Sequence, residues 1–362
     1  MSKRPKLIHF ITGLHADFGG RPFILPHALA ILSAQMAYPD HEIRVCYAHE
    51  PSGPAWEFVK PLVTPVVVEA PTEIFGRPVA HYAHSADVVR LQQLIAHGGL
   101  YFDTDTIVLR PIADLPEDRV VMGMEHDVDG LCNAFIAAPK NDVFLRTWLD
   151  RYRDFDQNDW GGHSILLPFK LAQEMADHIH IEPSSSFFIP HWDRGSLSDL
   201  FDSVVDTSRS YSIHLWESLS WHWLAGLTPS VISQIDTTYN MHARRVLAAF
   251  PDLAAALSPT RWQLEIAVDV DALPDGAADR SPFWYVALHD ADGGALTRID
   301  ADMEELAQIS FVPNTIVKLK RSVLAIAPPT HWTIYPVDRK RQWLAPMTGL
   351  IDSQNAAEKE GQ

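Results

Sequence analysis

Two carboxylates stand one residue apart, directly after a short apolar segment, in Gly98-Gly99-Leu100-Tyr101-Phe102-Asp103-Thr104-Asp105. A nucleoside diphosphate offers paired phosphate oxygens to a hard divalent cation, and such a cation is typically held by one or two carboxylates plus those phosphates. We therefore expect Asp103 and Asp105 to ligate Mn²⁺ or Mg²⁺. An Asp-X-Asp pair alone also describes an exposed turn, so the surrounding elements must decide between the two interpretations.

The elements that would position the pair are a helix and a strand. Apolar residues recur at helical spacing from about Ala86 to His97, with Ser85 able to cap the helix. Gly98 and Gly99 then end the helix, as glycine at this position usually does. Leu100-Tyr101-Phe102 reads as a buried strand, which places the carboxylates at its carboxyl end, where open α/β sheets bind ligands.

The longer pattern Asp87-x-x-Arg90, helix, Gly98-Gly99-x-Tyr101-x-Asp103-x-Asp105 resembles the glycosyltransferases with a D-x-D sugar-binding region. These comprise glycosyltransferase family 32, the related α-1,4-galactosyltransferases and the clostridial glucosylating toxins. The resemblance implies a GT-A-like, Rossmann-type α/β domain that binds a nucleotide sugar. It also implies catalytic roles for Asp87, Arg90, Asp103 and Asp105, with Asp87 and Arg90 holding the donor. The alternative for Asp87 and Arg90 is an intrahelical ion pair.

The resemblance extends to further donor contacts. Leu7-Ile8-His9-Phe10-Ile11 reads as the first strand and is similar to the family's opening strand, although Thr12 stands roughly where the family has tryptophan. His9 is equally well explained as a strand histidine with a local hydrogen bond. The donor-binding residues implied are Ile8, His9, Phe10, Asp87, Arg90, Tyr101, Asp103, Asn133 and Trp216.

A second informative segment is Tyr211-Ser212-Ile213-His214-Leu215-Trp216. It resembles the closing His-x-Trp segment of the galactosyltransferase relatives, which returns to the diphosphate and metal. On this resemblance His214 binds the diphosphate or completes the metal site with Asp103 and Asp105, and Trp216 shields the site from water. Imidazole is a plausible ligand for Mn²⁺. Taken alone, a His-x-Trp segment more often reflects core packing.

Composition narrows the class of protein. The chain has 362 residues and a formal net charge of −17, which argues against a basic nucleic-acid-binding surface. Its two cysteines, Cys46 and Cys132, suit a reducing compartment. No long apolar run suggests an integral membrane segment, and the N-terminus leads straight into a strand. We expect a bacterial cytoplasmic enzyme, with peripheral attachment to the inner membrane as an alternative.

The sequence divides into two parts that differ in their pattern of apolar residues. Residues 1–255 carry the α/β pattern, including strands at Val120–Met124 and Phe187–Pro190 and an acidic cluster at Glu125–Asp129 that is either a loop or part of the acceptor site. From 262 to 345 the chain alternates at period two, which predicts a β-rich accessory domain, with a sandwich as one form that it could take. Residues 350–362 form a polar tail that we expect to be flexible.

These features predict a metal-dependent glycosyltransferase, and the family resemblance implies that it retains the anomeric configuration. It would move a hexose or N-acetylhexosamine from a nucleotide diphosphate sugar, with a UDP-sugar favoured, to a saccharide or glycolipid acceptor in polysaccharide biosynthesis. Two alternatives stay open. One is a toxin-like effector that glycosylates a host protein, and the other is a noncatalytic carbohydrate-binding protein.

Overall fold

The computed structural model describes residues 3–16, 22–79, 81–126, 130–257, 260–269, 283–289, 295–300, 316–325, 331–337 and 347–350. The chain forms two compact units, Met1–Ala255 and Ala256–Gln362. The first unit holds the predicted site.

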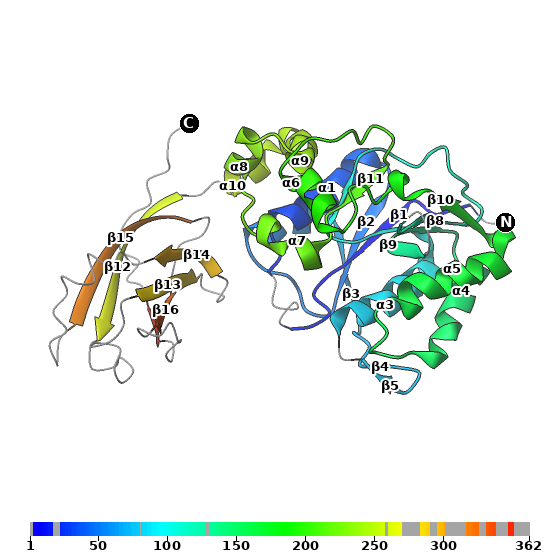
Figure 1. Ribbon diagram of the computed structural model, residues 1–362, viewed down its shortest axis with the longest axis horizontal. Coiled ribbons are helices and arrows are strands. Elements are labelled where there is room, and N and C mark those ends of the chain that lie inside the picture. The colour runs from blue at the N-terminus through cyan, green and yellow to red at the C-terminus, as the bar shows by residue number, and fades with distance from the viewer. Residues whose placement is uncertain are drawn as a thin grey trace. The chain divides into compact units, whose positions relative to one another are not determined.

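A seven-stranded sheet forms the centre of the first unit, in the order β10-β8-β9-β6-β1-β2-β3 (Figure 1). Strand β9 is antiparallel to both neighbours, and the other adjacent strands pair in parallel. The near-continuous burial of β1 and β6 fits a sheet covered on both faces. The strand bounds are β1 Leu7–Ile11, β2 Glu42–Tyr47, β3 Thr64–Val67, β6 Gly99–Phe102, β8 Val120–Met124, β9 Leu131–Ala138 and β10 Ile179–Glu182.

Helices lie on both sides of this sheet. Figure 1 shows α3, α4 and α5 on one side, and α1 with α6, α8 and α9 on the other. The bounds are α1 Leu25–Ala37, α2 Pro54–Val59, α3 Tyr82–His97, α4 Val143–Asp150, α5 Leu167–Glu174, α6 Arg194–Phe201, α7 Glu217–Leu224, α8 Pro229–Gln234, α9 Thr238–Ala249 and α10 Pro251–Ala256. A π-helical turn, Gly162–Leu166, precedes α5, and short 3₁₀ helices lie at Lys60–Leu62, Arg151–Asp154, Ala176–His178 and Ser184–Ser186.

Helix α3 starts four residues earlier than the sequence pattern indicates. His81 caps it by accepting a hydrogen bond from the Ala83 amide, whereas Ser85 is buried inside the helix and donates to the Pro71 carbonyl. The expected cap at Ser85 is therefore wrong, because the local pattern did not reveal that an imidazole could serve as the cap. The helix ends at Gly98, as predicted.

Two small antiparallel sheets complete the first unit. Strand β7 (Thr106–Val108) continues from the carboxylate pair and pairs with β11 (Ser212–His214), with His214 opposite Thr106. Strands β4 (Glu73–Ile74) and β5 (Arg77–Pro78) form a short hairpin. The strand predicted at Phe187–Pro190 is absent, because this buried segment packs its side chains in the core without joining a sheet.

The second unit is antiparallel β structure. Strands β12 (Thr260–Asp269) and β15 (Ile316–Ala325) pair with each other. Strands β14 (Ala295–Asp300), β13 (Phe283–His289), β16 (His331–Val337) and β17 (Met347–Leu350) form a four-stranded sheet in that order. Residues 301–315 of the period-two region, the acidic residues 127–129 and the tail 351–362 lie outside the described residues. The expected fold class, an α/β domain followed by a smaller antiparallel β part, is confirmed.

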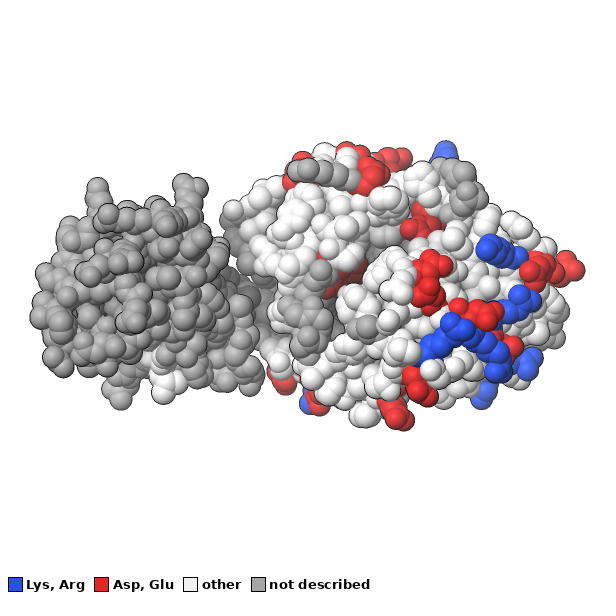
Figure 2. Space-filling view, turned by 60° about the horizontal axis from the view of Figure 1, so that its bottom comes forward, with Lys and Arg blue, Asp and Glu red and all other residues white. Residues whose placement is uncertain are grey.

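Charged side chains on the first unit are of mixed sign. On the face shown in Figure 2, Lys and Arg gather at one end and alternate with Asp and Glu. Pairs such as Arg153 with Asp150 and Arg151 with Glu174 are exposed, so each contributes little to stability. Among the described helices, none combines the length and apolarity needed to cross a membrane.

Candidate active site

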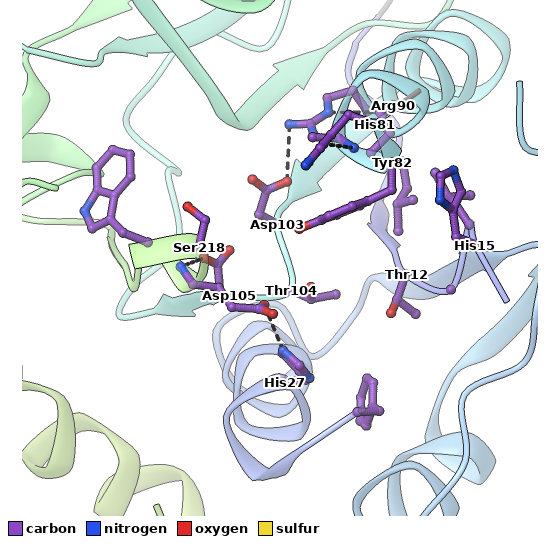
Figure 3. A pocket seen from close by; sticks show the side chains of 18 of the residues that line it. Thr12, His15, His27, His81, Tyr82, Arg90, Asp103, Thr104, Asp105 and Ser218 are labelled. Atoms are coloured by element: carbon purple, nitrogen blue, oxygen red, sulfur yellow. Dashed lines mark hydrogen bonds and ion pairs between the residues drawn. The ribbon is translucent and has the colours of Figure 1, made fainter. Parts of the chain in front are cut away.

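A cavity of about 350 Å³ lies where β1 and β6 end. The loop after β1 and the loop after β6 both line it, which is the edge where a parallel sheet binds ligands. Figure 3 shows Asp103, Thr104 and Asp105 near its centre, with Thr12 and His15 to one side and Arg90 behind. The lining residues are Ile11–His15, Pro22, Phe23, His27, His81–Ala83, Ala86, Arg90, Tyr101, Asp103–Asp105, Trp160, His214 and Trp216–Ser218.

Asp103, Asp105 and His214 form a possible cation site on this cavity. Their ligand atoms lie within 4.8 Å of one another. His214 Nε2 lies 3.1 Å from Asp105 Oδ1 and 3.9 Å from Asp103 Oδ2. The pairing of β7 with β11 brings these residues together, although His214 is 109 positions from Asp105 in the sequence.

Each carboxylate has one oxygen fixed by the protein and the other directed at His214. Asp103 Oδ1 accepts a hydrogen bond from the Tyr101 hydroxyl and an ion pair from Arg90 Nη1 at 3.2 Å. Asp105 Oδ2 accepts the backbone N–H of Glu217 at 2.8 Å. The remaining oxygens, Asp103 Oδ2 and Asp105 Oδ1, are the ones nearest His214 Nε2. Two carboxylate oxygens and an imidazole nitrogen are a donor set that Mn²⁺ accepts, so these residues fit the predicted ion.

Arg90 is a buried cation held by partners from three elements. Its Nη1 donates to the Asn133 carbonyl at 2.7 Å, and its Nη2 lies 3.3 Å from Asp87 Oδ1. Its guanidinium also stacks 4.6 Å from the centre of the Tyr101 ring. A buried charge is tolerated only when it is paired and hydrogen-bonded in this way. Arg90 thus fixes Asp103 with a geometry that a lysine could not reproduce.

Burial and neighbouring charges shift the pKa values of the three residues of the site in different directions. Burial alone would lower the pKa of His214, but the Asp105 carboxylate outweighs it and raises that pKa well above the usual range. Burial alone would raise the pKa of Asp105, but His214 and the Glu217 amide lower it. Burial raises the pKa of Asp103 against the opposing effect of Arg90. The two carboxylates therefore differ in proton affinity because only Asp105 contacts His214 closely.

Several predicted residues lie on the cavity. Asp103, Asp105, His214, Arg90, Tyr101 and Trp216 all belong to its lining. The Trp216 ring lies 4.1 Å from the His214 ring, and its Nε1–H donates to the Pro190 carbonyl at 3.0 Å.

Other predicted residues stand behind the cavity wall. Asp87 is 6% exposed, and its Oδ1 accepts a hydrogen bond from Asn133 Nδ2 at 2.7 Å, so the two side chains bind each other. Ile8, His9 and Phe10 are fully buried in β1, and His9 Nε2 donates to the Gly98 carbonyl. None of these five residues belongs to the lining. The end of β1 at Ile11 and the loop from Thr12 to His15 line the cavity instead, because side chains inside a doubly covered strand point into the core.

Residues outside the set of predicted site residues also line the cavity. His27 lies in the first turn of helix α1, Glu217 begins α7, and Tyr82 begins α3. Trp160 is 56% exposed at the cavity wall, with its ring 4.7 Å from that of His81. No local signal marked His27 and Glu217, since they are 190 positions apart and each resembles an ordinary helix-terminal residue.

Comparison with known proteins assigns the chain to a family. Residues 27–122 match the family described as "Glycosyltransferase sugar-binding region containing DXD motif". Glucan organizing enzyme 1 of Cryptococcus neoformans var. grubii serotype A is 32% identical over 255 residues, which cover 66% of this chain and 70% of that protein. The chain belongs to this family of glycosyltransferases. The predictions of a glycosyltransferase and of the D-x-D family are therefore confirmed.

Other proteins similar to this glycosyltransferase are more distant. O-glycosyltransferase braB of Annulohypoxylon truncatum is 28% identical over 121 residues, which cover 28% of each protein. Among solved structures, GlyE of Streptococcus pneumoniae TIGR4 is 11% identical, with a TM-score of 0.38, covering 68% of this chain and 64% of that one. The galactosyltransferase LgtC is 14% identical, with a TM-score of 0.32, covering 69% and 96%. These structural scores are too low to support an argument about substrates. Bacterial origin stays a prediction, since the two relatives named above are fungal.

Proposed function

We propose that this glycosyltransferase depends on Mn²⁺ or Mg²⁺ and transfers a hexose or N-acetylhexosamine from a nucleotide diphosphate sugar, with a UDP-sugar favoured. The observation that carries the proposal is the convergence of Asp103, Asp105 and His214 within 4.8 Å on the cavity. Each carboxylate keeps one oxygen directed at His214. When bound there, the cation would neutralise negative charge on the departing diphosphate.

The other residues of the site would hold and shield the donor. Arg90 orients Asp103 and places its positive charge beside the donor phosphates. Asp87 and Asn133 do not line the cavity, but they hold Arg90 in place through the Asp87 carboxylate and the Asn133 carbonyl. Trp216 covers His214 and would limit the access of water.

We propose that the reaction retains the anomeric configuration, as the family resemblance implies. The carboxylates on the cavity, Asp103, Asp105 and Glu217, each hold a protein partner. This arrangement suits a front-face reaction, which needs no protein nucleophile. The bond from the anomeric carbon to the phosphate oxygen breaks as the bond to the acceptor oxygen forms, and the acceptor proton passes to the departing phosphate.

The proposed acceptor is a saccharide or glycolipid hydroxyl in polysaccharide biosynthesis, and the proposed location is the cytoplasm. A toxin-like action on a host protein is the competing outcome. Incubation with labelled donor and either glycan acceptors or a host-cell lysate distinguishes them, because the label ends on glycan in one case and on protein in the other.

Nucleotide release tests the proposed donor chemistry. Purified protein is incubated with a panel of UDP- and GDP-sugars, with Mn²⁺, with Mg²⁺ and with EDTA. We expect release with a UDP-sugar and its loss in EDTA. The double variant Asp103→Asn with Asp105→Asn should reduce release by about a hundredfold or more, because the charge on the diphosphate is then poorly neutralised.

The control is Asp40→Asn, which changes an exposed carboxylate of the same type whose side chain is 78% accessible. This variant should match the unmodified protein. Equal release by the double variant, or full release in EDTA, would rule out the metal-dependent mechanism.

A further inference from the structure

A hydrogen bond joins His27 and Glu217 at the edge of the cavity, between the start of α1 and the start of α7. His27 Nε2 lies 3.0 Å from Glu217 Oε2, and the two side chains are 7% and 18% exposed. Figure 3 shows His27 beside the cavity, on a different element from Asp105. The pair thus links two segments at the cation site.

The backbone fixes which nitrogen of His27 carries the proton. The Ile24 amide donates to His27 Nδ1 at 3.1 Å. A backbone N–H can only donate, so Nδ1 must accept and cannot carry a proton. The ring is therefore the neutral tautomer with its proton on Nε2. That proton is donated to the Glu217 carboxylate.

Glu217 is tied through its backbone to the cation site. Its amide donates to Asp105 Oδ2 at 2.8 Å, and the neighbouring Leu215 amide donates to the Asp105 carbonyl at 2.8 Å. Between them, Trp216 adopts a left-handed backbone with φ of 55° and ψ of 53°. Such a conformation is unfavourable for a non-glycine residue, so the turn persists only where its surroundings hold it.

We propose that His27 is a positioning residue for the cation site, acting through Glu217. Its Nε2–H holds the Glu217 side chain, which keeps the Glu217 amide on Asp105 Oδ2. Asp105 Oδ1 then stays directed toward His214 Nε2, where a cation is to be bound. This inference rests on the proposed metal dependence. It adds a role for a residue on α1 that is remote in sequence from the D-x-D segment.

Two substitutions at position 27 distinguish the hydrogen bond made by Nδ1 from the one made by Nε2. In His27→Gln the longer side chain can still offer an N–H to Glu217. In His27→Asn the amide oxygen can still accept the Ile24 amide, but the side chain is too short to reach Glu217. Mn²⁺ affinity is measured directly from the EPR signal of free Mn²⁺. We expect His27→Asn to bind Mn²⁺ about tenfold more weakly and His27→Gln to stay near the unmodified protein, since loss of an outer hydrogen bond typically weakens metal sites to this extent.

Substitutions of Glu217 provide a second test, which leaves the sequence of α1 unchanged. Glu217→Gln keeps an acceptor oxygen for His27 and should bind Mn²⁺ nearly as well as the unmodified protein. Glu217→Ala should match His27→Asn. If circular dichroism shows that His27→Asn does not fold, the Glu217 variants still test whether His27 positions the cation site.

Unchanged Mn²⁺ affinity in folded His27→Asn or in Glu217→Ala would overturn the inference while leaving the proposed function intact. Failure of the unmodified protein to bind Mn²⁺ is a different result, and it would overturn both the metal dependence and the role of His27.

Discussion

At the scale of single residues, the site is built from buried charged side chains that are paired with other groups of the protein. Arg90 and Asp87 are 5% and 6% exposed, yet both lie on a helix that packs against the sheet. Removing one partner of such a pair leaves the other charge buried and uncompensated, which typically costs 3–5 kcal/mol.

Buried histidines should make the stability of the protein depend on pH. Burial in β1 lowers the pKa of His9 to about 4, against an unfolded value of about 6.5. Between these values the unfolded chain binds a proton that the native protein does not, so stability falls as pH drops from about 6.5 to 4 and then levels off. The contribution is up to about 3 kcal/mol.

The His9→Gln variant isolates this contribution. Glutamine can still donate to the Gly98 carbonyl but does not titrate in this range. Urea unfolding at a series of pH values should show a shallower loss of stability in the variant below pH 6.5. Parallel pH profiles for the two proteins would contradict the assigned pKa.

At the scale of elements, the junction between α3 and β6 sets the position of the carboxylate pair. Gly98 and Gly99 have φ values of 70° and 109°, in the region that favours glycine. They turn the chain from the helix into a strand that pairs in parallel with β1, with Tyr101 opposite His9. The chain then leaves β6 at Asp103, beside the loop that leaves β1. A substitution at this junction should therefore affect the cation site although it changes none of the residues proposed to ligate the cation.

Gly99→Ala tests the junction against a matched glycine. A Cβ at Gly99 would collide with the Leu7 carbonyl, whereas a Cβ at Gly76, where φ is 79°, meets nothing within 4 Å. Gly76→Ala should cost only the backbone strain, roughly 1–2 kcal/mol. Gly99→Ala should cost more, because β1 and β6 must also separate. Chemical denaturation of both variants measures the difference, and equal losses would show that the close approach of β6 to β1 is unimportant.

At the scale of the whole molecule, the cavity residues all belong to one of the two units. Each of the residues that line the cavity lies between Ile11 and Ser218, inside the unit Met1–Ala255. The second unit is antiparallel β structure and follows helix α10. The role of this second unit as an accessory domain stays a prediction.

A shortened chain of residues 1–257 should fold and release nucleotide from the same donor as the full chain. The cut falls after α10 and beyond Ala255, where the first unit ends, so the core of the first unit stays complete. Thermal unfolding and nucleotide release are compared with the full chain. A folded fragment without activity would show that the second unit takes part in the reaction.

The sequence alone determined the features that depend on local pattern. Helical spacing, two glycines and a short apolar run specified that a helix is followed by a buried strand ending at Asp103 and Asp105, because such signals act over a few residues. The family resemblance added His214 as a partner. The beginning of α3 was missed because a histidine cap carries little local signal.

Only the tertiary structure decided which residues face the cavity and which support it. Asp87 and Asn133 lie behind the wall, because the pairing of β6 with β9 brings the Asn133 strand up to α3. His27 reaches Glu217, and through it Asp105, only because α1 and α7 begin at the same edge of the site. The contact between His27 and Glu217 spans 190 positions and arises from strand pairing and from the packing of helices around the sheet. Residues next to His27 or Glu217 in the sequence do not indicate such long-range packing.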